Sequence, residues 1–418
     1  MRRAGLAGLG FVAGLWLLAV VALAGLWSGR GAPEPGVEEA ASSGRLLRPP
    51  SQAAQKTFRA LLTLPGQPSE GPGESGQEPP PPVPADPPRG VAEPPVRGGI
   101  FWSRALEAQV PPGFSAEEAA SWLRAAREAR VVSLERGGCG RSSNRLARLS
   151  DGSRACVRYG INAEQIQGEA LSYHLAGLLG IQERLPPLAL ARVEARGGQW
   201  APVRDELRGS PWADGAVVSL ARWVDNLTDV VAPAPWRAEA GAAATSGPRR
   251  LQPLSAGELR GLSQAQLVEL VQWSDLIVFD YVTANFDRLV SNLFSLQWDP
   301  RVMQRATSNL HRAPNGGLVF LDNEAGLVHG YRLLAMWDKY NEPLLRSVCV
   351  FREATAQRVR ELHRARNAAA QLLHLYRTRE PLAGVLGFLS EQQAQLLQDR
   401  VDFVHKHILH CKAKAASL

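Results

Sequence analysis

The uneven distribution of proline sets the strongest limit on where this chain can fold. Sixteen of its 30 prolines lie between residues 33 and 95, and four stand in a row at Pro79 to Pro82. Because proline has a fixed φ and no backbone N–H, such a stretch forms an extended, semi-rigid segment that buries little. We therefore predict a disordered stem over residues 28–98 and a folded part over 99–418. One apolar island, Phe58 to Leu64, either docks on the folded part or is unstructured.

A long apolar segment precedes the stem. After Arg3 no charged residue occurs before Arg30, and residues 5–27 are almost wholly apolar. About 20 apolar residues span a bilayer, and the preceding positive charge places residues 1–4 in the cytosol and the remainder in the lumen. Ala22-Leu23-Ala24 also fits a signal-peptide cleavage site, although the length of the segment favours a type II signal anchor. Both interpretations place the folded part in the secretory pathway.

Two further features agree with a secretory compartment. Asn226-Leu227-Thr228 is an N-glycosylation sequon, which makes Asn226 a candidate glycosylation site. The four cysteines, an even number, can pair in an oxidising lumen or remain buried thiols; they are Cys139, Cys156, Cys349 and Cys411.

The basic character of the chain comes almost entirely from arginine. The formal net charge is +7, and all but five of the 47 basic residues are arginine. These arginines are interspersed with acidic residues and form no long run, which is typical of a solvated basic surface. The composition therefore predicts no nucleic-acid partner.

Hydrophobic periodicity predicts an α+β fold with strands first and helices later. Alternating or β-branched runs indicate strands at 131–135, 145–149, 154–159, 188–193 and 217–223. Helical stripes cover Ala163 to Leu179, Gln264 to Thr283, and the ranges 351–377 and 391–410. A small β-rich lobe over about 99–225, followed by a larger helical lobe over about 226–418, is the order of a protein-kinase-like fold.

Two acidic residues in the helical half carry candidate chemistry. Asp287 and Asn292 follow the long apolar helix at the spacing of the catalytic base and the metal-binding Asn in the kinase catalytic loop. Asp322 ends an apolar strand from Leu318, as the metal-binding Asp of a kinase does, but Asn323 and Glu324 follow it in place of Phe-Gly.

The β-rich half carries candidate phosphate contacts. Gly138 and Gly140 belong to a Gly-rich turn whose backbone amides could approach phosphates. No lysine occurs between Lys56 and Lys339, so Arg158 is the cation in the place of the kinase strand lysine, and it could hold phosphate bidentately. Glu169, on the following helix, is placed to pair with Arg158; the alternative for both residues is an ordinary surface ion pair.

These residues in this order resemble the Four-jointed family. The family belongs to the atypical secretory-pathway kinases, which include the Golgi casein kinase. The resemblance rests on the Gly-rich turn, on Arg158 and Glu169, on the loop Asn285-Phe286-Asp287-Arg288, and on Asp322-Asn323-Glu324. It covers the folded part and the arrangement of anchor and stem.

The resemblance implies an enzyme, a location and a substrate. Asp287 would be the catalytic base of a Ser/Thr protein kinase, Asp322 a metal ligand, and Arg158 with Glu169 the contacts of ATP phosphates or of Mg²⁺ or Mn²⁺. The substrate would be Ser or Thr in extracellular cadherin domains of Fat and Dachsous type, modified in the Golgi, and the product would regulate growth and planar polarity. The pattern of the family also implies a disulfide between Cys349 and Cys411, and leaves the pairing of Cys139 and Cys156 open.

Other interpretations remain. A zinc site could form among His405, His407, His410 and Cys411, although a disulfide and solvated histidines explain the cluster more simply. The protein could instead be a secreted signalling protein on an inactive kinase fold. A Golgi glycosyltransferase is suggested only by anchor and stem, and the chain lacks the D-x-D motif that such enzymes use for metal binding.

Overall fold

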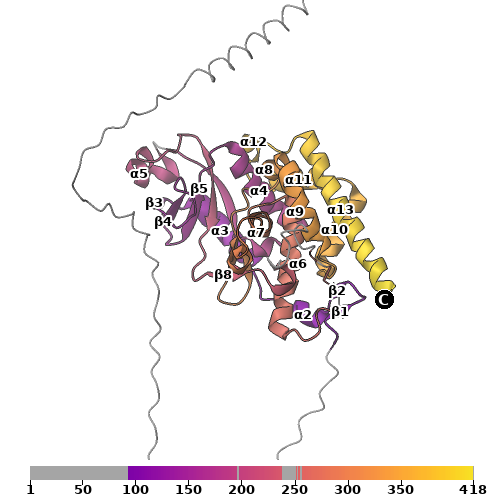
Figure 1. Ribbon diagram of the computed structural model, residues 1–418. Helices are drawn as coiled ribbons and strands as arrows, with labels where there is room; N and C mark the ends of the chain where they lie inside the picture. The colour runs from indigo at the N-terminus through magenta and orange to yellow at the C-terminus, as the bar shows by residue number, and fades with distance from the viewer. Residues whose placement is uncertain (1–92, 195–196, 238–250, 252, 255–256, 418) are drawn as a thin grey trace, which may run out of the picture. The chain divides into compact units, whose positions relative to one another are not determined.

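The computed structural model describes residues 93–194, 197–237, 251, 253–254 and 257–417. The predicted anchor, the apolar island and most of the predicted stem lie outside these residues. Among the described residues, no helix combines the length and the apolar composition that crossing a bilayer requires. The described part folds into a β-rich lobe and a helical lobe, which are seen at the left and the right of Figure 1.

The β-rich lobe is built on a five-stranded antiparallel sheet. Its spatial order is β3 (Val131–Arg136), β4 (Arg145–Leu149), β5 (Arg154–Arg158), β7 (Val217–Arg222) and β6 (Leu188–Arg192). These are the five strands that the sequence predicts, with ends that differ by at most a residue or so. One face of the sheet packs on a core that includes Trp122, Trp200 and Val218. The short helix α5 (Arg204–Arg208) and the 3₁₀ turn η2 (Gly198–Val203) extend this lobe.

Helices α3 and α4 cover the sheet. α3 (Ala116–Glu128) packs on β6, and α4 (Ala163–Leu178) packs on β6 and β7. Hydrophobic periodicity did not predict α3, although a capping box of Ser115 and Glu118 marks its start. The Ser115 hydroxyl accepts a hydrogen bond from Glu118 N–H, and the Glu118 carboxylate accepts one from Ser115 N–H. α4 lies between the two lobes and brings Glu169 to their junction.

The helical lobe is organised around α6 (Gln264–Thr283), which has the bounds that the sequence predicts. Most of its side chains are buried, because other elements surround it on nearly all sides. The α-helices that follow α6 in the described part of the chain are α7 (Leu289–Ser295), α8 (Val328–Arg332), α9 (Leu334–Arg346), α10 (Glu353–Ala365), α11 (Ala368–Arg379), α12 (Ala383–Leu386) and α13 (Glu391–Ala416). The long α13 packs on α6, α10 and α11 along the outer side of the lobe (Figure 1).

One predicted helix proves to be two. The range 351–377 was expected to be continuous, but the chain breaks between α10 and α11, where Arg366 adopts a left-handed conformation with φ of 55°. The Arg366 N–H still donates to Leu362 O, so this residue caps α10 in the way that ends many helices. The break lets α11 turn back and pack on α4 as well as on α13. The apolar spacing of the two helices continues across the break, which is why periodicity did not reveal it.

A second, small sheet lies between the two lobes and leads to Asp322. It has the order β10 (Leu318–Phe320), β9 (Ala306–Arg312) and β8 (Thr228–Val231), all antiparallel. β8 directly follows the first sheet in sequence, and β9 and β10 carry the chain from the loop after α6 to Asp322. The second sheet therefore places Asn309 and Asp322 opposite the first sheet.

The first described residues pack on the helical lobe, whereas the sequence analysis assigned residues up to 98 to the stem and those from 99 onward to the β-rich lobe. β1 (Val96–Arg97) pairs with β2 (Phe101–Trp102), so the chain is already folded inside the range assigned to the stem. The Trp102 indole N–H donates to Ser274 Oγ of α6 at 3.1 Å, and Phe101 forms an isolated parallel β-bridge with Phe351. The next helix, α2 (Arg104–Ala108), also packs on α6. These contacts join positions far apart in sequence, so local patterns could not show them.

All four cysteines are paired, one disulfide in each lobe. Cys349 and Cys411 are joined, as the family resemblance implies, with a Cα–Cα distance of 5.4 Å, and this ties α13 to the segment after α9. Cys139 and Cys156, whose pairing the sequence left open, are also joined, at a Cα–Cα distance of 5.6 Å. Because Cys411 is oxidised, it offers no thiolate to the zinc site considered above.

Candidate active site

A cavity of about 470 Å³ lies between the two sheets. Its walls come from the Gly-rich turn, from β5, β6 and β7, from α4, from β9 and from the end of β10. The lining includes six of the predicted site residues, namely Gly138, Gly140, Arg158, Glu169, Asn226 and Asp322, and also Asn309 and the apolar Leu185, Leu188 and Phe320. A cleft between two lobes with apolar walls and a few converging charges is a common form of a small-molecule site.

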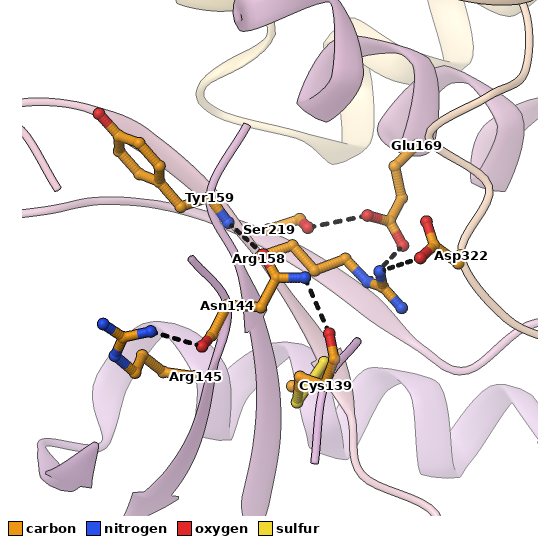
Figure 2. Close-up of a disulfide and its surroundings, with 9 residues drawn as sticks. Cys139, Asn144, Arg145, Arg158, Tyr159, Glu169, Ser219 and Asp322 are labelled. Atoms are coloured by element: carbon orange, nitrogen blue, oxygen red, sulfur yellow. Dashed lines mark hydrogen bonds and ion pairs between the residues drawn. A yellow bond between two sulfur atoms is a disulfide. The ribbon is translucent and has the colours of Figure 1, made fainter. Parts of the chain in front are cut away.

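Arg158 is the central cation of this cavity. Its side chain is only 7% exposed, and it is directed between two carboxylates (Figure 2). Arg158 Nε lies 3.4 Å from Glu169 Oε1, and Nη1 lies 2.5 Å from Asp322 Oδ2. Burial alone would lower the pKa of Arg158, but the carboxylates of Glu169 and Asp322 raise it above its ordinary value. The pair is therefore a buried charge cluster and not the surface ion pair considered from the sequence.

Glu169 is held in place by α4 and by the sheet. Ser219 Oγ, on β7, donates to Glu169 Oε2 at 3.1 Å, as Figure 2 shows. α4 can approach the loop after β10 closely because Gly168 has no side chain, since a Cβ there would lie 2.7 Å from Gly326 O. Burial raises the pKa of Glu169. The close packing thus fixes the distance between Glu169 and the Asp322 loop.

The loop that begins at Asp322 adds a third carboxylate. Asp322 has φ of 49°, a left-handed conformation that Asp tolerates better than most residues and that a tight turn requires. Two residues later, Glu324 pairs with Arg141 of the loop between β3 and β4. Burial raises the pKa of Glu324 to about 8, and the neighbouring carboxylates of Glu169 and Asp322 act in the same direction. The cluster therefore contains more carboxylates than its arginines neutralise.

The Gly-rich turn closes one side of the cavity. Gly137, Gly138 and Gly140 all have φ between 79° and 88°, a region that only glycine enters without strain. The disulfide from Cys139 to Cys156 ties the turn to β5. The Asn144 side chain, 1% exposed, donates to Cys139 O at 2.8 Å (Figure 2). The turn is thus anchored beside Arg158.

Asp287 lies next to the cavity, in the loop after α6. Its N–H donates to Asn285 Oδ1 at 3.0 Å, and its Oδ2 accepts from Asn309 Nδ2 at 2.9 Å. Burial and the charge of Asp322 raise the pKa of Asp287 above its usual value. Asn292, the predicted metal ligand, is buried in α7 and, like Asp287, is not among the residues that line the cavity. Asn309 supplies the amide that holds Asp287, a contact that the spacing of Asp287 and Asn292 does not predict.

Arg288 joins the two acidic loops. Its side chain is fully buried and pairs with Asp280 of α6. The guanidinium also donates to Leu321 O at 2.8 Å, to Asn323 Oδ1 at 2.6 Å and to Asn309 O at 3.2 Å. These bonds connect the residue after Asp287 with both neighbours of Asp322 and with the backbone of Asn309. Arg288 therefore acts as the positioning residue of the site.

The other predicted sites lie apart from this cluster. Asn226 is exposed, has φ of 55° and stands at the rim of the cavity in the connection between β7 and β8, so its position is open to modification. His405 stacks on His363 with ring centroids 4.0 Å apart, and His407 Nε2 lies 2.7 Å from Val348 O. The histidine cluster is thus occupied by packing and backbone contacts.

Sequence comparison assigns the chain to a family. A family sequence model described as the Four-jointed box protein middle domain matches residues 117–414. The Homo sapiens protein named Four-jointed box protein 1 is 63% identical over 427 residues, which cover 96% of each chain. The chain belongs to the Four-jointed family. Another relative, the Drosophila melanogaster protein named extracellular serine/threonine protein kinase four-jointed, is 35% identical over 359 residues, which cover 76% of this chain and 61% of that protein.

Structural comparison agrees with the family on the fold. The crystal structure of the Golgi casein kinase matches with a TM-score of 0.50 and 13% identity, and the match covers 71% of this chain and 75% of that chain. At this identity the likeness concerns the fold. The Four-jointed chain therefore has the kinase-like fold that the order of its elements predicts.

The residues of this Four-jointed chain suit a nucleotide and a divalent cation. Nε and Nη1 of Arg158 are buried and face carboxylates without a hydrogen bond of good geometry, and Oε1 of Glu324 is buried without a hydrogen-bond partner. Guanidinium groups bind phosphate, and carboxylate oxygens are the ligands that Mg²⁺ and Mn²⁺ prefer. Asp322, Glu169 and Glu324 would hold the cation, which would neutralise charge on the phosphates.

Two side chains of this site, Asn309 and Arg141, carry little local sequence signal for their roles. Asn309 lies in mid-strand at φ of 57°, and no local pattern marks it. Arg141 follows directly after the Gly-rich turn, and that position was its one available signal. Both reach their partners only through tertiary packing.

Proposed function

We propose that this chain is a secretory-pathway Ser/Thr protein kinase that transfers the γ-phosphate of ATP to hydroxyl groups of extracellular cadherin domains of Fat and Dachsous type. The observation that carries the proposal is the convergence of Arg158, Glu169 and Asp322 on one cavity, with Asp287 beside it. These four residues come from both lobes, and each has the charge that phosphoryl transfer requires at its position.

Each residue then has a defined task. Arg158 holds phosphate oxygens through its forked N–H groups, and Glu169 orients Arg158. Asp287 accepts the proton of the substrate hydroxyl while the hydroxyl oxygen bonds to the γ-phosphorus. The bond between the γ-phosphorus and the β–γ bridging oxygen breaks at the same time, which releases ADP. Burial raises the pKa of Asp287, which makes its carboxylate a better proton acceptor. The Asn309 amide holds that carboxylate in position.

Several features support a protein substrate met in the Golgi or outside the cell. The Drosophila relative carries the name of an extracellular Ser/Thr protein kinase. Two disulfides suit an oxidising compartment. The apolar segment 5–27 would anchor the protein in the Golgi membrane with its folded part in the lumen, and cleavage there or in the stem would release it.

The test is transfer from labelled ATP to a purified cadherin repeat, with Mg²⁺ or Mn²⁺. We expect Asp287→Ala and Asp322→Ala each to lower kcat by a factor on the order of a thousand or more, because one removes the proton acceptor and the other a ligand of the cation. Secretion and thermal stability should stay close to wild type. Asp205→Ala is the matched control, since its side chain is 88% exposed on α5.

The result also separates the competing class of function. A wild-type protein that binds the repeat but transfers no phosphate with either cation would be a non-catalytic signalling protein on a kinase fold. Full activity in Asp287→Ala would remove the role assigned to that residue.

A further inference from the structure

A continuous row of aromatic side chains leads from the catalytic loop to the surface. Phe286, the neighbour of Asp287, stacks on Trp337 of α9 with ring centroids 4.7 Å apart and planes at 4°. Trp337 contacts Phe294 of α7 at 4.9 Å, and Phe294 contacts Trp298 at 4.8 Å. We call Phe286, Trp337, Phe294 and Trp298 the aromatic row.

The outer end of the aromatic row is open to solvent. Trp298 is 67% exposed, although Trp is a side chain that folding normally covers. Met336, the neighbour of Trp337 on α9, is 50% exposed. The other large apolar side chains that are exposed among the described residues lie on other elements; these are Val132, Ile161, Val385 and Leu409. The row thus ends in one exposed ring that packs on partly buried ones, and exposed apolar surface backed in this way can bind other molecules.

We propose that the aromatic row is the docking surface for the polypeptide segment that flanks the acceptor Ser or Thr of the protein substrate. The inference rests on the proposed function and deepens it, because it identifies the residues that select the substrate. The recognised chemistry is an apolar or aromatic side chain of the substrate, which packs on Trp298 and Phe294.

The position of the row is what selects this occupant. The acceptor hydroxyl must reach Asp287, so the chain that carries it must pass the loop Asn285 to Arg288. Phe286 belongs to that loop, and its ring begins the row. A substrate segment that leaves the site along this side therefore passes next to the row.

The length of the row limits where the determinant lies in the substrate. The row has three ring-to-ring steps of nearly equal length. An extended polypeptide advances about 3.4 Å per residue. The row therefore spans at most about four residues of an extended substrate, and the apolar side chain should lie within that distance of the acceptor on one side.

The experiment compares Trp298→Ala and Phe294→Ala with Leu409→Ala in the full-length protein. Leu409 is 52% exposed on α13, so it controls for the loss of an exposed apolar side chain. For a cadherin repeat as substrate, we expect Trp298→Ala to raise KM about tenfold, the ratio that a loss of about 1.4 kcal/mol produces. The KM for ATP, kcat and the melting temperature should not change, and direct binding of the repeat should weaken by the same factor.

The outcomes distinguish this inference from the proposed function. If the wild type transfers no phosphate but binds the repeat in a manner that depends on Trp298, the proposed activity fails and the docking surface stands. If the wild type is active and Trp298→Ala has an unchanged KM, the docking surface fails alone. Replacing apolar residues within about four positions of the acceptor by Asp should raise KM for the wild type and have little further effect on Trp298→Ala.

Two other occupants give different results, and either one would overturn the inference. If a second copy of this chain covers the row, sedimentation will show a dimer that Trp298→Ala converts to a monomer. If residues 58–64 of the stem cover the row, their deletion will lower KM in the wild type and leave Trp298→Ala unchanged.

Discussion

Two buried arginines stand a short distance apart in this protein, and they have opposite surroundings. Arg288 is fully buried, and its nitrogens bond to a carboxylate, a side-chain amide and two backbone carbonyls. Arg158 is nearly as buried, but its Nε and Nη1 have carboxylates nearby and no hydrogen bond of good geometry. The first arrangement is complete within the chain, whereas the second leaves polar atoms that a ligand could satisfy.

The balance of charge shows the same difference. Arg288 and Asp280 form a pair of one positive and one negative charge. Burial raises the pKa of Asp280 to about 6, and the charge of Arg288 acts in the opposite direction. Around Arg158, burial raises the pKa of both Glu169 and Glu324, and the charges of the neighbouring carboxylates raise it further. A structural arginine is recognised by satisfied bonds and a functional one by unsatisfied bonds with surplus charge. The following changes test that distinction.

The largest effect is expected from Arg288→Met. This change leaves Asp280 buried without its partner and releases the loops that carry Asp287 and Asp322. Removing one member of a buried ion pair costs on the order of 3–5 kcal/mol of unfolding free energy. Urea unfolding of the purified protein measures the loss. Arg208→Met is the control, because its side chain is 70% exposed and should change stability by less than about 0.5 kcal/mol.

A smaller effect that separates the two arginines is expected from lysine substitution. Arg158→Lys keeps the charge but loses the forked contact, so ADP affinity should fall about tenfold while the melting temperature stays near wild type. Arg288→Lys should show the reverse, with a lower melting temperature and nearly unchanged ADP affinity in the folded fraction. Calorimetric titration and thermal unfolding measure the two quantities. If both variants melt early and bind ADP normally, Arg158 is structural as well.

The smallest effect is expected from Glu324→Gln without nucleotide or divalent cation. The folded protein holds the Glu324 proton up to about pH 8, while the unfolded chain releases it near the usual value of 4.5. Between these values the folded state binds more protons, so stability is lost as the pH rises through this window. Gln removes the titration, and the variant should therefore melt a few degrees above wild type at about pH 8.5 and close to it at about pH 5.

The control for this pH dependence is Glu206→Gln on α5, where the carboxylate is exposed. Its melting temperature should follow the wild type at both pH values. A Glu324→Gln variant that gains no stability at the higher pH would mean that Arg141 neutralises Glu324 fully, and the surplus of negative charge around Arg158 would be smaller than the structure indicates.

Much of this site could be read from local patterns. Arg158 and Glu169 were found because a strand and the next helix follow each other closely, and alternation and helical spacing report such elements directly. Asp287 and Asp322 were found because each follows an apolar element that ends at the same junction. The five strands of the first sheet and the full length of α6 were predicted for the same reason.

The remaining features depend on contacts between distant positions. Asn309, and not Asn292, supplies the amide at Asp287, because the register of β9 and β10 decides which side chain faces the loop. The hairpin of β1 and β2 joins the helical lobe through Ser274 and Phe351. Local patterns are enough to place most of the larger elements, their order and the charged residues at their ends, since these depend on neighbours along the chain. Which of those charges are satisfied depends on packing, because burial and partners come from segments up to hundreds of residues apart.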